Sequence, residues 1–187
     1  LFMKNLDYRG CLVIGWIYSV LHSEEIFRRF QMFPGLFLYG KLQSGKDVLA
    51  GWIMSFFGLP RTIAQSFSET TQVAVNRLFA MFSCMPVWLD EFRHTDNKAK
   101  WKYAFLRGVY NRTGAAKGLR DDPLAIRSVA IRGVPLLSGE QLPGDPALRS
   151  RYVRILLSGS ERGDDVYEEI ERLSKQFSAI TVHWLRN

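Results

Sequence analysis

The segment Gly40-Lys41-Leu42-Gln43-Ser44-Gly45-Lys46-Asp47 has two glycines that bracket four residues, and a lysine follows the second glycine directly. This spacing is that of a phosphate-binding loop. Small residues let successive backbone N–H groups face one concave nest, and the helix that follows adds the positive end of its dipole. We therefore expect residues Gly40 to Val48 to bind ATP, with the Lys46 ammonium on the β- and γ-phosphates.

The position after the lysine departs from the usual pattern. Asp47 stands where a serine or threonine would offer a hydroxyl to Mg²⁺. A carboxylate is also a ligand for Mg²⁺, but it adds negative charge beside the phosphates. The loop thus favours nucleotide binding more firmly than fast hydrolysis.

The residues on both sides of this loop fit a strand, a turn and a helix. The apolar run Leu36–Tyr39 predicts a strand, and apolar residues recur with helical spacing from Val48 to Phe57. A glycine–lysine turn alone is also found in ordinary strand-to-helix connections. The flanking pattern favours the phosphate-binding interpretation.

A second acidic motif lies further along the chain. The apolar run Met85–Leu89 predicts a buried strand, and two carboxylates, Asp90 and Glu91, follow it. Placed beside a phosphate-binding loop, Asp90 would hold the shell of Mg²⁺, and Glu91 would deprotonate the attacking water. A buried strand that ends in a polar loop is the alternative for this segment taken alone.

The composition is that of a folded domain. Hydrophobic residues make up 47% of the 187 residues and aromatic residues 13%, which suits one α/β domain with a substantial core. The longest apolar run, Cys11–Leu21, is about half of the ~18–20 residues that span a membrane. No signal peptide is recognisable, so we expect a cytoplasmic protein, and a chain that begins at Leu1 is expected to be a piece of a longer one. Cys11 and Cys84 are expected to be buried reduced thiols rather than a disulfide.

The basic residues are concentrated in one segment. Nine lysines and arginines and only two aspartates lie between Lys98 and Arg132, so this segment accounts for the whole net charge of +7. Such a segment predicts a polyanion-binding surface with contacts to phosphates, and a solvated helix face with its loop is the alternative. The DNA-binding candidates are Arg112, Lys117, Arg120, Arg127 and Arg132.

The rest of the chain alternates helical and extended patterns. We expect helices from about Tyr8 to Phe30, a short strand at 62–67, a helix with Ser68 as its N-cap, a helix from Asp96 to Gly114 with lysines on its polar face, strands at 128–138 and 152–157, and a helical tail from Asp164.

With these motifs, the chain resembles the AAA+ ATPases. It looks most like the superfamily 3-like helicase domains fused to primases or replication initiators of phages, plasmids and mobile islands. The resemblance rests on Gly40–Asp47, Pro86–Glu91, Tyr110–Arg120, Leu136–Glu140 and Ala147–Arg151. It implies an α/β P-loop NTPase fold of three layers with a central, mostly parallel sheet. The implied division is a helical segment at 1–35, an ATPase core at 36–160 and a helical segment at 161–187.

The resemblance also implies roles for residues outside the two motifs. Ser138 or Glu140 would act as the sensor of the γ-phosphate. Arg151, with Arg149 as the second choice, would reach the ATP of a neighbouring subunit in a ring that is usually hexameric, and surface salt bridges are the alternative for both arginines. The basic stretch from Arg112 to Arg132 would lie toward the central channel and follow a DNA strand, most plausibly a single strand.

Three functions fit these motifs. The first is an ATP-driven DNA helicase or translocase of a replication protein, and the second is an ATP-gated DNA-binding or assembly module in which Asp47 weakens hydrolysis. A regulatory ATPase of a defence or transposition system would share every motif.

Overall fold

A sheet of five parallel strands forms the centre of the molecule, with the strand order β2-β3-β6-β1-β7. The computed structural model describes residues 1–92, 100–114, 116–118, 126–128, 130–159 and 164–186. Because the strands are parallel, their carboxyl ends all lie at one edge of the sheet. The α/β class and the central parallel sheet expected from the sequence are confirmed.

The elements follow one another along the chain as α1 (Phe2–Leu6), α2 (Tyr8–Leu21), α3 (Ser23–Phe30), β1 (Gly35–Tyr39), α4 (Lys46–Phe56), the 3₁₀ helix η1 (Arg61–Ile63), β2 (Gln65–Ser66), α5 (Gln72–Met81), β3 (Pro86–Phe92), α6 (Lys100–Tyr110), β4 (Ala116–Gly118), β5 (Ile126–Ser128), β6 (Val134–Gly139), α7 (Pro146–Arg149), β7 (Tyr152–Leu156), α8 (Asp164–Ser174) and α9 (Phe177–Arg186).

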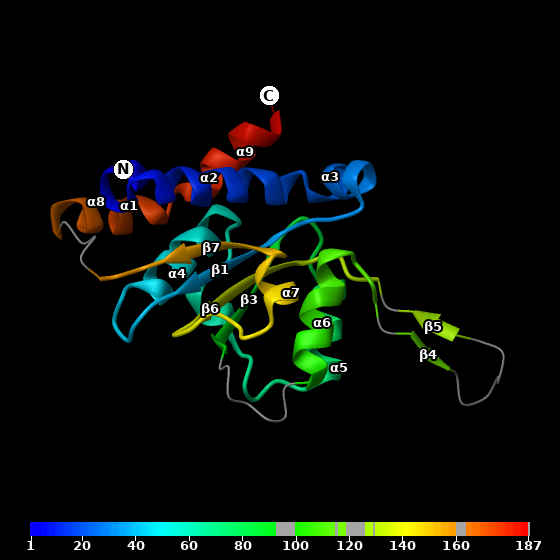
Figure 1. The fold of residues 1–187 in the computed structure, drawn as a ribbon. Helices are drawn as coiled ribbons and strands as arrows, with labels where there is room; N and C mark the ends of the chain where they lie inside the picture. Colours follow the sequence, from blue (N-terminus) through cyan, green and yellow to red (C-terminus); the bar gives the residue numbers. More distant parts are fainter. Residues whose placement is uncertain (93–99, 115, 119–125, 129, 160–163, 187) are drawn as a thin grey trace.

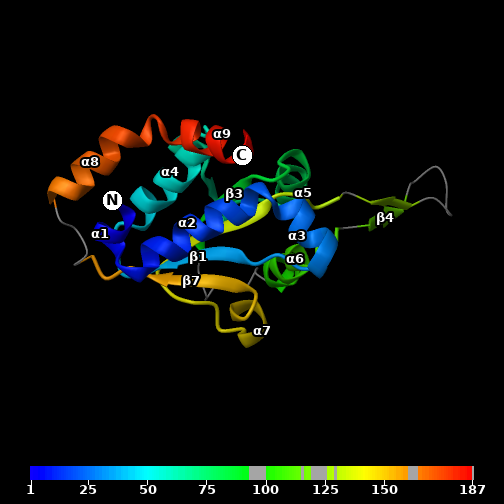
Figure 2. The same cartoon turned by 90° about the horizontal axis from the view of Figure 1, so that it is seen from above.

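Helices cover both faces of the sheet. Side chains alternate along a strand, so Leu36 and Leu38 of β1 belong to one hydrophobic cluster while Phe37 belongs to another. The first cluster takes in α1, α2, α4, α8 and α9, and the second takes in α5, α6 and α7. Figure 1 shows α1, α2, α8 and α9 above the strands and α5 and α6 below them, and Figure 2 shows α2 running across β1.

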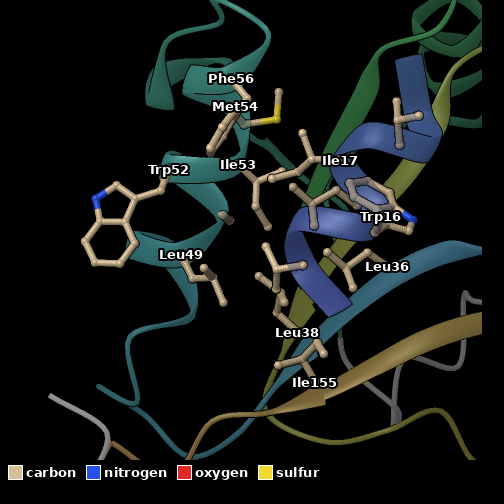
Figure 3. Packing of buried hydrophobic residues seen from close by; sticks show 14 of the residues in the cluster. Trp16, Ile17, Leu36, Leu38, Leu49, Trp52, Ile53, Met54, Phe56 and Ile155 are labelled. Carbon is tan, nitrogen blue, oxygen red and sulfur yellow. The ribbon is translucent and has the colours of Figure 1, made fainter. Parts of the chain in front are cut away.

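The cluster around α2 and α4 is packed from three directions. Ile17 of α2 and Ile53 of α4 have no exposed surface, and both lie over the strands. Figure 3 shows their side chains converging with those of Trp16, Leu36, Leu38, Leu49, Met54 and Ile155. Each large side chain buried in this way contributes about 1.5–3 kcal/mol relative to its exposed state. This packing fixes α4, and with it the start of α4, against the sheet.

Trp52 of α4 points away from α2 (Figure 3), and its indole connects α4 to α8. Its indole donates a hydrogen bond of 2.7 Å to Glu171 of α8, and Arg61 forms an ion pair with the same carboxylate. Burial opposes ionisation of Glu171, but the hydrogen bonds from Trp52 and Arg61 outweigh it and lower the pKa of Glu171 below its usual value. Helix α8 is thereby attached directly to α4, the helix that follows the loop.

The terminal helices share a core with the sheet. The Phe2 ring lies 6.0 Å from the Trp52 ring and 5.8 Å from the Phe177 ring, so α1 meets both α4 and α9. The expected boundaries at 35/36 and 160/161 stay a prediction, but the elements on either side of them belong to one cluster.

A two-stranded hairpin, β4 and β5, projects from the body between α6 and β6 (Figure 1). In both views it extends on the side away from the loop that joins β1 to α4 (Figures 1 and 2). Within the described residues, no helix combines the length and apolar character that crossing a bilayer requires.

Three local predictions about helix ends are wrong. The helix after the loop begins at Lys46 rather than Val48. The N-cap of α5 is Thr71, whose side chain accepts a hydrogen bond from the Ala74 amide, because Ser68 lies before a further turn. Helix α6 ends at Tyr110 instead of Gly114, and the left-handed residue beyond it is Arg112, with φ of 52°.

Two predictions about burial are also wrong. Lys102 is only 5% exposed, although the lysines were expected on the polar face of this helix. Its ammonium donates to the Ser68 carbonyl and lies 5.1 Å from the centre of the Phe67 ring, so aromatic contacts compensate for its burial. Cys11 is exposed rather than buried, and both it and Cys84 are free thiols. The expected start of α6 at Asp96 lies outside the described residues.

Candidate functional site

The conformation of the loop from Gly40 to Gly45 requires glycine at both of these positions. A Cβ atom at Gly40 would overlap the carbonyl oxygen of Leu157, at the end of β7. Gly45 has φ of 90° and is the N-cap of α4, and Gln43 is also left-handed with φ of 60°. A side chain at either glycine would therefore require the loop to move or to be strained.

Lys46 is folded back over this loop. Lys46 is only 9% exposed, and its Nζ donates to the carbonyl oxygens of Gly40 at 3.0 Å and Lys41 at 2.8 Å. It also lies 3.5 Å from the Ser44 hydroxyl. Because charge-assisted bonds to an anion are stronger than bonds to neutral carbonyls, this ammonium is suited to exchange the carbonyls for phosphate oxygens.

The order of the strands brings the acidic motif to the same edge as the loop. Strand β6 lies between β1 and β3, so Ser138 of β6 separates the loop from Asp90. The Ser138 hydroxyl has no exposed surface, donates to Asp90 Oδ1 at 2.6 Å and accepts from Trp88 Nε1 at 2.7 Å. This chain of hydrogen bonds fixes one oxygen of Asp90 and leaves the other for a ligand.

Asp47 and Asp90 interact electrostatically across this edge. The side chain of Asp47 stays exposed, but partial desolvation at the start of α4 raises its pKa. Repulsion by Asp90 raises the pKa of Asp47 further, and attraction by Lys46 opposes both effects. A divalent cation bound by the two carboxylates would relieve the repulsion between them.

Glu91 has an unusual backbone and a fixed side chain. Its φ is 56°, in the left-handed region, and the pairing of β3 with β6 shifts by one residue between Leu89 and Phe92. Such bulges redirect side chains, and backbone strain of this kind concentrates at functional sites. The hydroxyls of Ser66 and Ser68 donate to Glu91 Oε2 at 3.0 and 3.3 Å.

The remaining sequence-predicted residues of the ATP site lie at opposite edges of the sheet. Glu140 is exposed immediately beyond β6. Arg149 and Arg151 precede β7, so they lie at the amino edge of the sheet, opposite to the loop. There Arg149 donates to the Gly144 carbonyl at 3.4 Å, while Arg151 donates to the Ala147 carbonyl and lies over the Tyr110 ring.

The predicted DNA-binding residues differ in what the structure describes of them. Arg112 forms an ion pair of 2.7 Å with Glu24 of α3, lies 4.6 Å from the centre of the Phe27 ring, and has a side chain only 11% exposed. It thus joins α3 to the end of α6, and its DNA contact stays a prediction. Arg132 is exposed just before β6. Lys117 and Arg127 occupy paired positions of the hairpin, and Arg120 lies outside the described residues.

Sequence reasoning missed three contributors to this site. Trp88 was assigned only to a buried strand, although a buried indole usually needs an acceptor for its N–H. Ser66 and Ser68 flank a buried phenylalanine near the end of β2, and this alternation was the available signal for two hydroxyls on one side. Nothing in the local sequence indicates that they meet Glu91.

At this edge of the sheet, an anion-binding loop lies beside a small group of carboxylates. Among the described residues, no cluster of three or more histidine, cysteine or acidic side chains is placed to hold a metal ion. A site for Mg²⁺ needs less from the protein, because one or two carboxylates combine with substrate phosphates and water.

In comparisons with known proteins, no family model matches the chain, and neither a curated protein nor a solved structure matches it. The function therefore has to be inferred from the residues of this chain.

Proposed function

We propose that this chain is the motor domain of an ATP-dependent DNA helicase or translocase, with a P-loop NTPase fold of the AAA+ type. The observation that carries the proposal is the meeting of Lys46, Asp47 and Asp90 at one edge of a parallel sheet. Ligands of open α/β sheets bind at this carboxyl edge, at the point where the connections that follow two neighbouring strands run in opposite directions. Here β1 lies between β6 and β7, and its loop occupies such a position.

The residues present fit ATP with Mg²⁺. The loop would bind the phosphates, and Lys46 would leave its two carbonyl acceptors to contact phosphate oxygens. Asp90, oriented by Ser138, and Asp47 supply oxygen ligands of the type that Mg²⁺ prefers. The bound cation would offset the charge of the phosphates and the repulsion between the two carboxylates.

Glu91 is our candidate for the general base. It follows Asp90 directly and lies in a strained bulge that sets the direction of its side chain. The hydrogen bonds from Ser66 and Ser68 hold its Oε2, so Oε1 is the oxygen that would accept a proton from water.

The hairpin is our candidate for the DNA contact. Its backbone register pairs Lys117 with Arg127, so two basic residues occupy directly paired positions of the sequence. The phosphates of DNA are the polyanion that lysine and arginine residues neutralise. The exposed Arg132 lies between the hairpin and β6.

A homo-oligomeric ring, hexameric by the resemblance, would complete the site. Arg149 and Arg151 lie at the amino edge of the sheet and the loop lies at the carboxyl edge. A subunit could present these arginines only to the ATP of another subunit, in a head-to-tail arrangement.

A second function, an ATP-gated DNA-binding or assembly module with weak hydrolysis, is favoured by two observations. Asp47 replaces a hydroxyl and carries a raised pKa beside Asp90, and Glu91 is engaged by two serines. In this case ATP binding, rather than turnover, would change the affinity for DNA.

The test compares three proteins: wild type, Glu91→Gln and Lys46→Ala. Calorimetry measures ATP binding, and phosphate release measures hydrolysis with and without single-stranded DNA. For a motor we expect DNA to stimulate hydrolysis, Glu91→Gln to bind ATP normally while losing about 100-fold or more of the rate, and Lys46→Ala to lose ATP binding. Hydrolysis by Glu91→Gln at the wild-type rate would refute the assigned base.

Size-exclusion chromatography with ATP and DNA tests the ring. ATP binding without DNA-stimulated hydrolysis would favour the gated module. A folded wild-type protein that does not bind ATP with Mg²⁺ would refute both functions.

A further inference from the structure

Strand β7 forms an open edge of the sheet. It is the last strand in the order β2-β3-β6-β1-β7, and within the described part of the chain it pairs only with β1. Figure 2 shows β7 on the outer side of β1, with α7 near its start. The unpaired side of an edge strand presents backbone donors and acceptors to which another strand can bind.

The hydrogen bonds at the two ends of β7 show which of its residues face β1. The Gly35 amide donates to the Arg151 carbonyl just before the strand, and the Leu157 amide just after the strand donates to the Tyr39 carbonyl. Because backbone groups point to alternate sides along a strand, the odd-numbered residues of this segment bond to β1. The even-numbered residues therefore direct their N–H and C=O groups away from the sheet.

The outward residues are Tyr152, Arg154 and Leu156. The Leu156 carbonyl confirms this direction, because it accepts a hydrogen bond of 2.8 Å from the Arg9 guanidinium of α2. Among the described residues, no other backbone group bonds to the Tyr152 carbonyl, the Leu156 N–H or either backbone group of Arg154. This edge thus offers both donors and acceptors, and the contact with Arg9 marks its carboxyl end.

The side chains along this edge are basic. Arg154 is exposed in the middle of β7, and Arg149 and Arg151 precede the strand. Asp145, the N-cap of α7, is already paired with Arg107 at 2.7 Å. An incoming strand that carries carboxylates would therefore meet complementary charge, and opposite charges on paired strands stabilise the pairing.

We propose that β7 binds an extended, acidic segment of another protein, which joins the sheet as a sixth strand. The outward backbone groups provide the hydrogen bonds, and the Arg154 guanidinium selects carboxylates on its own face of the added strand. This interaction goes beyond the proposed function and does not involve the phosphate-binding loop.

Two other occupants fit this edge less well. A second copy that paired all five residues of β7 in an antiparallel arrangement would place Arg154 opposite Arg154, and like charges at directly opposite positions are destabilising. The phosphates of DNA offer only acceptors, so they would leave the Tyr152 and Arg154 carbonyls unpaired. A peptide backbone supplies both kinds of group.

The experiment measures binding of two fluorescein-labelled peptides to the whole chain by fluorescence anisotropy. Each peptide has about seven residues, enough to cover β7 and its flanks, with valines on one face and either glutamates or lysines on the other. Wild type is expected to bind the glutamate peptide about fivefold or more tightly than the lysine peptide. Arg154→Glu should reverse this preference, and Arg154→Gln should bind the two peptides equally.

Arg77 of α5 provides a matched control. It is exposed, and α5 joins β2 to β3 on the other side of the sheet. Arg77→Glu changes the net charge as much as Arg154→Glu does, but it should keep the preference for the glutamate peptide. Thermal unfolding confirms that each variant is folded.

Amide hydrogen exchange, followed by NMR, tests strand addition itself. At a peptide concentration ten times the dissociation constant, exchange of the Arg154 and Leu156 amides should slow by about tenfold. The Val153 and Ile155 amides face β1 and should be unaffected. A contact made by the arginine side chain alone would not slow the outward amides.

Every other result refutes the proposal. Equal binding of the two peptides by wild type, no binding of either, or a glutamate preference that survives in Arg154→Glu refutes the acidic partner. Binding without slower exchange at Arg154 and Leu156 refutes the added strand. Dimerisation that protects these amides without peptide assigns the edge to a second copy instead. Because no step uses ATP, these failures leave the proposed function standing, and a failure of ATP binding leaves this inference standing.

Discussion

The buried hydrogen bonds from Trp88 through Ser138 to Asp90 allow a quantitative test. Ser138→Ala removes a hydroxyl that has no exposed surface and leaves the Trp88 N–H, in a residue 4% exposed, without its acceptor. A buried donor that loses its partner costs about 1–3 kcal/mol. Taking about 2 kcal/mol, and about 2–4 °C per kcal/mol for a chain of this size, the Tm should fall by about 4–8 °C.

A double-variant cycle isolates the hydrogen bond from the loss of volume. Trp88→Phe is destabilising because the smaller ring leaves a cavity, but it also removes the donor that Ser138→Ala leaves unpaired. The double variant should therefore be less destabilised than the sum of the single variants, by about 1 kcal/mol.

The assay is urea unfolding at pH 7 without nucleotide, with Ser19→Ala as a control. Ser19 is only partly buried and its hydroxyl donates to the Gly15 carbonyl within α2, so this change should stay within about 0.5 kcal/mol of wild type. Effects of Ser138→Ala and Trp88→Phe that add within about 0.3–0.5 kcal/mol would refute the coupling. An unchanged stability of Ser138→Ala would refute the hydrogen bonds themselves.

Three further predictions concern the loop and two carboxylates. Gly40→Ala should lower the Tm by several degrees and abolish ATP binding, since its Cβ meets backbone, whereas Gly15→Ala, which meets nothing within 4 Å, should be neutral or stabilising by up to about 1 kcal/mol. Asp47 has a raised pKa in the folded state, so its ionisation opposes folding as the pH rises from acid to neutral; Asp47→Asn should unfold at a higher temperature than wild type at pH 7 without Mg²⁺. The reverse order of melting temperatures would contradict this desolvation effect. The pKa of Glu171 is lowered in the folded state, so its carboxylate stabilises the fold above its usual pKa of 4.5, and this stabilisation is lost as the pH falls through the folded pKa. Equal pH profiles of wild type and Glu171→Gln in urea unfolding would show that the contacts of Glu171 with Arg61 contribute nothing to stability.

The sequence predicted the sheet and the edge at which the site lies. The apolar runs of β1 and β3 are buried on both faces of a parallel sheet, and such strands are recognisable without knowledge of their neighbours. The loop motif could be located because its geometry depends on residues adjacent in sequence, and both Gly40 and Gly45 are required by local clashes and backbone angles.

The contacts between distant segments could not be predicted. Ser66 meets Glu91, and Trp88 meets Ser138, because β2, β3 and β6 are neighbours in space, which periodicity does not reveal. Lys102 was placed on a polar face because helical spacing cannot show that Ser68 and an aromatic ring surround its ammonium.

The position of the arginines before β7 has a consequence for mixtures of subunits. β7 has five residues, so its two ends are separated by roughly 16 Å at ~3.3 Å per residue. Under the proposed function, a polypeptide that lacks Lys46 still donates Arg151, and one that lacks Arg151 still contributes Lys46. A mixture of the two inactive variants should then recover part of the ATP turnover, and progressive dilution of the mixture should abolish this recovered turnover again.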